Sequence, residues 1–204
     1  MLKKLSLALF CALPLGGDAQ NQEERWLNPL VNRVHCEAPR SPFFAYESED
    51  LADFGDKTKS SRYYSLEGMW KFKFVPHHNL RPRHFQELDF DDSLWEDFPV
   101  PGLFELHGYG DAIYKNIGYA WATQFENNPP YVEEKNNYTG SYRKVIEVPA
   151  DWKGREVFIT FDGVDSFFYL WINGKYVGFS KNSRNAAEFN ITPYLKEEGE
   201  NTVA

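Results

Sequence analysis

The stretch Phe167-Phe168-Tyr169-Leu170-Trp171-Ile172-Asn173-Gly174-Lys175-Tyr176-Val177-Gly178-Phe179-Ser180 decides the fold class of this chain. Residues 167–172 form an unbroken apolar run, which is typical of a strand buried on both faces. The Asn-Gly dipeptide that follows is the strongest short hairpin signal, because a type I′ turn needs positive φ at both central positions. Residues 175–180 then read as the return strand. The stretch therefore predicts a β-hairpin.

Further strands are predicted on both sides of this hairpin. Residues 70–74, Trp-Lys-Phe-Lys-Phe, alternate apolar and charged side chains, as a half-buried strand does. Residues 141–148 alternate in the same way except at Lys144, and they place Arg143 on the polar face. No stretch carries helical periodicity over three turns, and turn residues recur about every 8 to 12 positions. We therefore expect an all-β fold, an antiparallel β-sandwich. Shorter strands are expected at residues 157–161, 188–192 and from 201 onward.

The chain reads as one domain preceded by an irregular segment. Residues 20–65 are polar and contain three prolines, so we expect an extended segment lying across a sandwich formed by residues 66–204. Residues 99–102, Pro-Val-Pro-Gly, predict a turn. Residues 103–140 are rich in glycine and aromatic side chains and predict a long loop region, a feature that is often functional. Residues 200–204 begin a strand with no turn after it, so the domain reads as truncated at its C-terminus.

The amino-acid composition excludes several classes of partner. With 22 Lys and Arg against 30 Asp and Glu, the formal net charge is −8, opposite in sign to what nucleic acid or anionic lipid requires. We therefore expect no nucleic acid and no membrane among the partners. Aromatic residues make up 17% of the chain, which favours β structure and is compatible with sugar binding.

The first 19 residues have the layout of a cleavable secretory signal. Lys3 and Lys4 form a positive start, residues 5–15 are apolar, and small residues precede Gln20. The apolar run is too short for a helix to span a bilayer core of about 30 Å. We predict a signal peptide over residues 1–19 and an exported protein, either periplasmic or secreted.

Cysteine usage agrees with that assignment. The alternative, a lipoprotein signal that uses Cys11, is disfavoured by the large Phe10 before it. If Cys11 leaves with the signal, Cys36 is the single remaining thiol, and one thiol forms no intrachain disulfide.

Several stretches, taken in order along residues 26–203, resemble one family. They include Ser65-Leu66-Glu67-Gly68-Met69-Trp70-Lys71-Phe72, His107-Gly108-Tyr109-Gly110-Asp111-Ala112-Ile113-Tyr114-Lys115-Asn116, Asn128-Pro129-Pro130-Tyr131-Val132, Phe161-Asp162-Gly163-Val164-Asp165-Ser166 and Glu188-Phe189-Asn190-Ile191-Thr192. Any one of them is weak, but all of them in order are specific. They resemble the N-terminal sugar-binding domain of glycoside hydrolase family 2, in particular that of long bacterial β-galactosidases. The resemblance implies a jelly-roll β-sandwich of the galactose-binding-like kind, in agreement with the strand pattern.

The resemblance implies a substrate contact at Asn128. In the family, the Asn of the Asn-Pro-Pro stretch lies on a loop that reaches the active site of the neighbouring barrel domain and touches the galactose. An amide offers both donors and acceptors, so it can pair with sugar hydroxyls in either sense. Two prolines after Asn128 would hold the loop at low entropic cost. The alternative is that Asn128 only sets the turn before the prolines.

The resemblance also implies that the chemistry lies elsewhere. Retaining glycoside hydrolysis needs two carboxylates about 5–5.5 Å apart, and in the family both are Glu residues on a downstream (β/α)₈ barrel. The family's Mg²⁺ and Na⁺ sites are downstream too. We expect no catalytic residue, cofactor or metal in this chain, and no turnover by the chain alone. Its own acidic turn residues are expected in solvent; they are Glu87, Asp89, Asp91 and Asp92.

The tryptophans provide a second candidate contact. Trp can stack on a sugar face, but within strands it more often belongs to a core or an interface. Trp121 lies in the predicted loop region and is therefore the best stacking candidate, with Tyr109 and Tyr119 next. Trp70, Trp152 and Trp171 are expected in the core or at an interface.

Three functions of different class remain open. The chain is a fragment of an exported β-galactosidase that helps to shape the active site, a stand-alone carbohydrate-binding module, or a structural shell domain. Its partners would be a galactoside or another glycan and, for the first and third functions, the catalytic barrel. The long aromatic loop region favours these two, because it needs a partner to cover it. Whether the parent enzyme is a homo-oligomer stays open.

Overall fold

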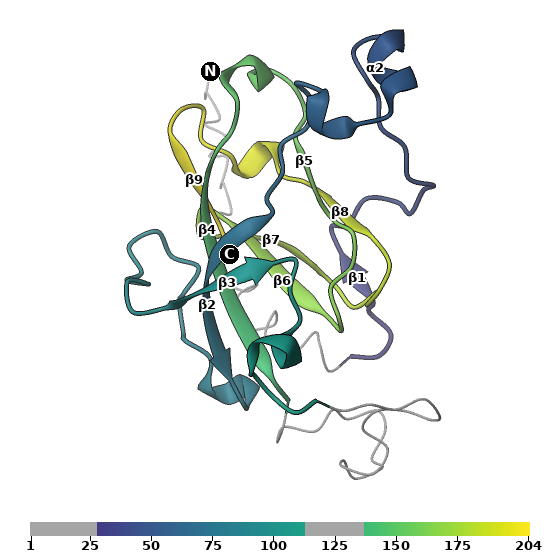
Figure 1. Ribbon diagram of the computed structural model, residues 1–204. Helices are drawn as coiled ribbons and strands as arrows, with labels where there is room; N and C mark the ends of the chain where they lie inside the picture. Colours follow the sequence, from purple (N-terminus) through teal and green to yellow (C-terminus); the bar gives the residue numbers. More distant parts are fainter. Residues whose placement is uncertain (1–27, 113–136) are drawn as a thin grey trace, which may run out of the picture.

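The computed structural model describes residues 28–112 and 137–204 (Figure 1). Regular structure in these ranges is mostly strand, so the predicted all-β class is confirmed. No helix within them is long and apolar enough to cross a membrane. The strands are β1 (Arg33–Val34), β2 (Gly68–Val75), β3 (Glu96–Val100), β4 (Thr139–Glu147), β5 (Phe158–Phe161), β6 (Phe168–Ile172), β7 (Lys175–Ser180), β8 (Ala187–Asn190) and β9 (Glu200–Val203). The helical elements are the α-helix α2 (Glu49–Phe54) and the 3₁₀ turns η2 (Lys57–Lys59), η3 (His78–Leu80), η4 (Phe104–His107), η5 (Ala150–Trp152) and η6 (Thr192–Tyr194).

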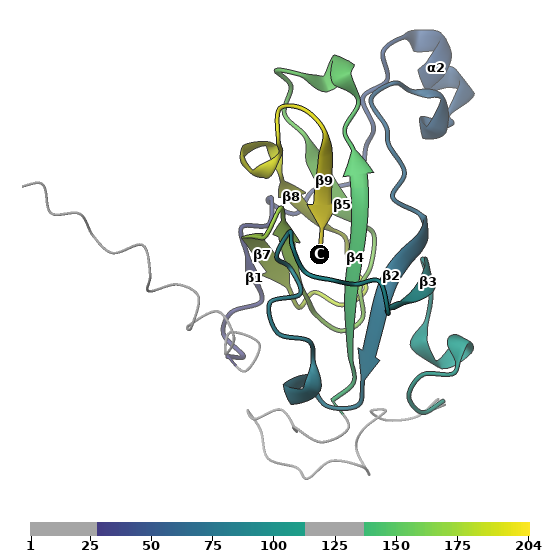
Figure 2. The ribbon, with the colours of Figure 1, turned by 90° about the vertical axis from the view of Figure 1, so that its left-hand side faces the viewer.

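The strands form two antiparallel layers. One is a seven-stranded sheet in the order β1-β7-β6-β9-β4-β2-β3, and the other is the pair β5-β8 (Figures 1 and 2). The main core lies between them, where Ile159 of β5 and Phe189 of β8 pack with Leu170 and Ile172 of β6. The predicted β-sandwich is therefore confirmed, whereas its jelly-roll connectivity stays a prediction.

The predicted hairpin is confirmed at the level of its turn. Ile172 pairs with Lys175, so β6 and β7 are joined by two residues. Asn173 has a φ of 52° and Gly174 a φ of 76°, as a type I′ turn demands. The Asn173 amide also donates to the Tyr194 carbonyl at 2.9 Å and accepts from the Thr202 amide at 2.9 Å. The turn is thereby tied to β9.

The strand β3 replaces part of a predicted turn. Residues 99–102 were expected to form a turn, but Pro99 and Val100 belong to β3 and pair with Met69 and Gly68. Proline has no N–H to donate to a ladder and is therefore tolerated on edge strands. β3 is an edge strand of the large sheet. The prediction was wrong because a proline signal does not distinguish an edge strand from a turn.

The outer face of β4 is covered where the sequence pattern suggested solvent. Arg143 is buried, with only 6% of its side chain exposed. Its Nε lies 2.6 Å from Asp92 Oδ2, and its Nη1 donates to the carbonyls of Phe85 and Glu87. The expectation that Asp92 is solvated holds only in part: its side chain is 29% exposed, and its carboxylate contacts Arg143 where the segment 85–92 folds over β4.

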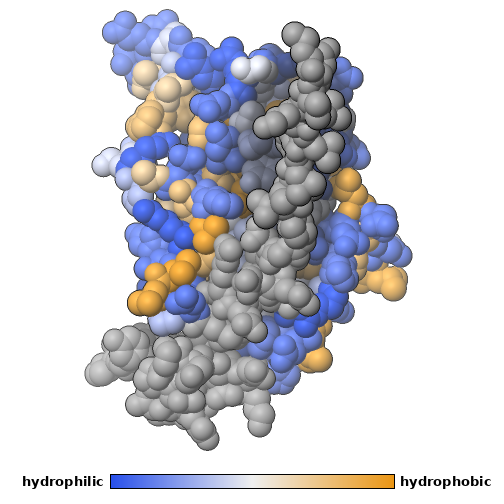
Figure 3. Space-filling model, turned by 180° about the vertical axis from the view of Figure 1, so that it is seen from behind, coloured by the Kyte–Doolittle hydropathy of each residue, from blue (hydrophilic) through white to orange (hydrophobic). Residues whose placement is uncertain are grey.

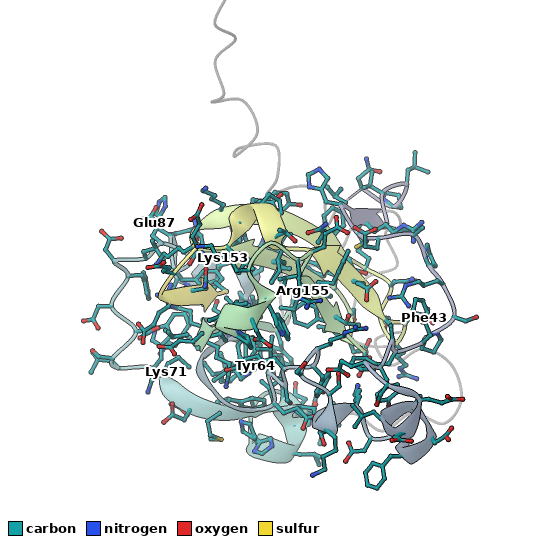
Figure 4. All side chains as sticks on the ribbon, turned by 90° about the horizontal axis from the view of Figure 1, so that it is seen from above. Phe43, Tyr64, Lys71, Glu87, Lys153 and Arg155 are labelled. Atoms are coloured by element: carbon teal, nitrogen blue, oxygen red, sulfur yellow. The ribbon has the colours of Figure 1, made fainter. Side chains whose placement is uncertain are left out.

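The segment before β2 contacts both sheets near its start. β1 extends the large sheet beyond β7, and Arg40 forms an ion pair with Glu188 of β8 at 2.8 Å. The helix α2 covers six residues, begins at the N-cap Ser48 and ends at Gly55, whose φ is 74°. Seen from above, Phe43 lies on the opposite side of the molecule from Lys71 and Glu87 (Figure 4).

Several hydrophobic side chains remain at the surface. Met69 and Val145 on the outer face of the sheet are 56% and 55% exposed, and Leu94 is 92% exposed. In the face shown in Figure 3, hydrophobic residues form separate patches among hydrophilic ones. Scattered exposure of this kind is usual for folded proteins and needs no partner to explain it.

Candidate functional site

The two predicted substrate contacts, Asn128 and Trp121, lie outside the described residues. The structure does describe the chain on either side of residues 113–136. We call residues 104–112 and 137–140 the loop stem. Its first part contains η4, and its second part enters β4, whose Thr139 pairs with Val75 at the end of β2. The stem therefore lies at one end of the β2–β4 ladder (Figures 1 and 2).

The stem rests on a cluster of aromatic rings. Phe72 of β2 and Phe98 of β3 are each 1% exposed, with ring centroids 4.5 Å apart. Phe104 of η4 and Tyr142 of β4 lie 5.6 and 4.8 Å from Phe72. Ring pairs at such separations add stabilisation beyond the area they bury. The end of the sheet that carries the stem is thus a second, aromatic part of the core.

A glycine lets the second part of the stem approach these rings. A Cβ atom at Gly140 would lie 2.7 Å from ring carbons of both Phe72 and Phe104. Real Cβ atoms keep more than 3.0 Å from such neighbours, so a larger residue would push the stem off the cluster. Glycine at position 140 therefore allows the stem to lie against the aromatic rings.

Two tyrosines enclose Phe74 at the end of β2. The rings of Tyr109 and Tyr138 each lie 5.4 Å from the Phe74 ring, centroid to centroid. Tyr109 comes from the first part of the stem and Tyr138 from the second. Gly110, with a φ of 70°, passes so close to Tyr138 that an added Cβ atom would lie 2.8 Å from its ring. The two parts of the stem are therefore packed against each other.

Both tyrosines donate hydrogen bonds to carboxylates. The Tyr109 hydroxyl donates to Glu96 of β3, and the Tyr138 hydroxyl donates to Asp111. The bond to Asp111 raises the pKa of Tyr138 to about 12, and the bond to Glu96 also raises the pKa of Tyr109. Both phenols therefore keep their protons and remain donors at neutral pH. Carboxylates and phenols at a glycine-rich stem can position a loop or bind hydroxyl groups.

The other tryptophans have structural contacts. Trp70 is 6% exposed, and its Nε1 donates to the Leu66 carbonyl at 2.8 Å. Trp152 donates to the Ser61 carbonyl at 2.7 Å, and the Trp171 ring lies 5.6 Å from that of Phe85. The core role is confirmed for Trp70, while Trp152 and Trp171 are only partly buried and join the sheets to neighbouring segments.

The acidic turn residues have separate roles. Hydrogen bonds from Ser93, first from its side chain and then from its amide at 3.0 Å, lower the pKa of Asp91. The Glu87 carboxylate lies 3.0 Å from Nδ1 of His84. The Asp92 carboxylate forms an ion pair with the Arg143 guanidinium. In the described parts of the chain, no group of three or more His, Cys, Asp or Glu side chains is arranged to hold a metal ion.

Of the stem residues, the sequence singles out Tyr109, as a stacking candidate next after Trp121, but not Asp111 or Tyr138. Asp111 and Tyr138 are 27 positions apart and carry no shared periodicity. The glycines at 108, 110 and 140 are a further signal, because glycine marks close approach of backbone to other groups.

Comparison with known proteins decides the family. A family model described as "Glycosyl hydrolases family 2, sugar binding domain" matches residues 63–204. The chain belongs to this family. The family 2 domain is 43% identical over 182 residues to a β-galactosidase of Halalkalibacterium halodurans, a match that covers 87% of this chain and 17% of that protein. It is 39% identical over 183 residues to a β-galactosidase of Vibrio vulnificus, which covers 90% of this chain and 17% of that protein.

The family 2 domain thus spans about a sixth of the length of these curated relatives. Among solved structures, it is similar to a calcium-binding mutant of Bacteroides uniformis β-glucuronidase 2, with 24% identity and a TM-score of 0.49 over 69% of this chain and 14% of that chain.

Proposed function

We propose that this family 2 domain is the non-catalytic sugar-binding part of an exported β-galactosidase, and that it helps to bind terminal β-galactosides. The observation that carries the proposal is the 43% identity, over 87% of this chain, to a β-galactosidase of which the match covers only 17%. Most of that relative therefore lies outside the matched part, and we infer that the partners of this domain belong to the same enzyme. The catalytic barrel is the partner that the family resemblance suggests.

Asn128 is the proposed substrate contact. The stem supports this role, because Asp111 and Tyr138 hydrogen-bond to each other and so bring both ends of the intervening segment to one end of the sheet. Trp121 in the same segment is the proposed stacking partner for a sugar ring, since aromatic rings offer large apolar faces.

The proposed reaction of the parent enzyme is hydrolysis with retention, by two carboxylates of the barrel. This chain orients the sugar and selects among patterns of hydroxyl groups. A sugar that lacks the matching hydroxyl leaves the Asn128 amide unpaired, which costs about 1–3 kcal/mol of binding free energy. The Mg²⁺ and Na⁺ of the family are assigned to other parts of the enzyme.

A chimeric enzyme tests the proposal. The matching part of the H. halodurans β-galactosidase is replaced by this chain, and kcat/KM is measured with a chromogenic β-galactoside. The chimera is expected to turn over the galactoside, and Asn128→Ala is expected to lower kcat/KM by about 5- to 150-fold, the range of one unpaired buried polar group. Asn127→Ala is the matched control and should stay close to the parent value.

Two outcomes would contradict the proposal. If Asn128→Ala and Asn127→Ala leave kcat/KM equally unchanged, the domain is a structural shell. If calorimetric titration of the chain alone with galactose or lactose gives millimolar or tighter binding, it is a stand-alone carbohydrate-binding module. The chain alone is expected to bind neither sugar at that level and to show no turnover.

A further inference from the structure

The outer face of the β5–β8 pair carries both aromatic and polar side chains. Ile159 of β5 and Phe189 of β8 point into the core, so the residues that alternate with them along the two strands face outward. Two side chains of the N-terminal segment join these outward-facing residues. We call the whole set the small-sheet face; its members are Arg40, Phe43, Phe158, Thr160, Glu188 and Asn190.

Arg40 is fixed in place on this face. Its Nη2 donates to both carboxylate oxygens of Glu188, at 2.8 and 3.0 Å, and its guanidinium carbon lies 4.3 Å from the centroid of the Phe43 ring. The Glu188 carboxylate also accepts from the Thr160 hydroxyl at 2.9 Å. The Glu188 carbonyl accepts from the Glu37 amide at 2.8 Å, which ties the N-terminal segment to β8. Because the guanidinium is held before any ligand arrives, it loses little freedom on binding.

The fixed side chains still offer hydrogen bonds to a ligand. A guanidinium carries several N–H donors, the contacts with Glu188 use those on Nη2, and 43% of the Arg40 side chain is exposed. On the neighbouring part of the face, Asn190 is the partner of Phe158 across the two strands. The Asn190 amide lies 3.4 Å from Glu156, a long hydrogen bond that a ligand hydroxyl can replace.

Two aromatic rings accompany these polar groups and are open to solvent. Phe43 is 70% exposed and Phe158 is 42% exposed. Phe43 lies at the periphery of the molecule (Figure 4). A sugar ring presents an apolar patch of C–H groups on its face and hydroxyl groups around its rim. Exposed aromatic rings beside fixed donors and acceptors match these two kinds of surface.

The formal charges of the face fit a neutral ligand. Arg40 and Glu188 offset each other, and Glu156 adds a negative charge beside Asn190. A glycan with uronate or sulfate groups would therefore meet no net attraction here, whereas hydroxyl groups pair with donors and acceptors alike.

We propose that the small-sheet face is a carbohydrate-binding surface, additional to the substrate contact proposed above, and that it takes a neutral glycan chain. Phe43 and Phe158 stack on sugar rings, and Arg40 donates to the hydroxyl groups between them. The family description as a sugar binding domain supports a sugar as the occupant. A face on two strands covers only part of each sugar unit, so the affinity comes from several units of one chain. Galactose and lactose are consequently too short to bind it at millimolar concentration.

Affinity electrophoresis of the full chain tests this surface. Native gels contain a linear galactan, a galactomannan or a xyloglucan, and a gel without polysaccharide gives the reference mobility. At least one of the three should retard the parent chain. Phe43→Ala and Phe158→Ala should each raise the dissociation constant by about 2- to 10-fold, the range of one lost aromatic contact. Phe54→Ala is the matched control, because Phe54 is 68% exposed on α2, outside the face, and it should change the constant by less than about 2-fold.

A change at Arg40 tests the donor role. Arg40→Lys keeps the positive charge beside Glu188 and removes the planar fork of donors, so it should raise the dissociation constant by about 2- to 10-fold. The midpoint of urea unfolding is measured for each variant and should match that of the parent chain. If Phe158→Ala lowers this midpoint, Phe158→Leu takes its place, because leucine keeps an apolar side chain without a ring.

Several results would overturn the proposal. One is a parent chain that none of the three neutral polysaccharides retards. Another is retardation that Phe43→Ala and Phe158→Ala leave unchanged, or that Phe54→Ala weakens equally. Stronger retardation by polygalacturonate than by the neutral chains would assign the face to anionic ligands instead. A parent dimer in sedimentation that Phe43→Ala or Phe158→Ala converts to a monomer would make the face an interface between copies of this chain.

Discussion

Removal of the Asp92 carboxylate should destabilise the domain more than removal of any neighbouring acid. Arg143 is buried at 6% exposure, and Asp92, at 29%, is the carboxylate that its Nε reaches, at 2.6 Å. In Asp92→Ala the guanidinium keeps its two carbonyl acceptors but loses its counter-charge. Breaking a buried ion pair costs about 3–5 kcal/mol when the remaining charge is dry.

The partial exposure of Asp92 reduces that figure. Water can approach the guanidinium from the side that the carboxylate leaves, so we expect a loss of about 2–3 kcal/mol in the free energy of unfolding, the range of a hydrogen bond to a charged group. For a chain of this size that corresponds to a fall of about 5–10 °C in Tm. Asp92→Asn keeps an acceptor and should lose less than Asp92→Ala.

Urea unfolding followed by tryptophan fluorescence gives the measurement. Asp89→Ala is the matched control, because Asp89 is an exposed acid in the same turn. It should change the free energy of unfolding by less than about 0.5 kcal/mol. The reasoning is refuted if Asp92→Ala is as stable as Asp89→Ala at an unchanged m-value, since the buried arginine would then need no counter-charge.

Three further outcomes are expected. Gly178→Ala should lower Tm and speed proteolysis of the N-terminal segment, because an added Cβ would lie 2.2 Å from the Val34 carbonyl oxygen of β1. Gly163→Ala is the control, because the atoms nearest to an added Cβ there are 3.7 Å away. Hydrogen bonds from Ser61 and then Ser60 lower the pKa of Glu47 to about 2. Because the folded pKa is below the unfolded one, this stabilisation is present above about pH 4.3 and is lost as the pH falls toward 2. Glu47→Gln should therefore flatten the stability–pH curve, measured by urea unfolding, in that acidic window. Finally, protein recovered from a secreting host should begin at Gln20 by N-terminal sequencing, and an intact Met1 would contradict the predicted signal peptide.

Local pattern was sufficient for most of the fold. The apolar run before Asn173 and the Asn-Gly dipeptide predict β6, its turn and β7, because side-chain alternation and positive φ are properties of neighbouring residues. β1 was missed because a strand of two residues carries no pattern of its own and exists only through pairing with β7. The burial of Arg143 was missed for a similar reason, since it depends on a segment more than fifty positions away.

The candidate site was less accessible to sequence reasoning. Asn128 and Trp121 came from a resemblance and from loop position, and both remain predictions. Asp111 and Tyr138 meet through a tertiary contact that the local sequence around either residue does not predict. Carboxylates and phenols are common on surfaces, so only the close approach at Gly110 distinguishes this pair from others.

The position of β9 between β6 and β4 has a consequence for folding during synthesis on the ribosome. Among the described strands β9 comes last in the sequence but lies in the middle of the sheet, so the hairpin of β6 and β7 and the ladder of β2 and β4 join only after residues 200–203 have left the exit tunnel. Until then the nascent chain exposes one unpaired strand edge on each half, that of β6 and that of β4.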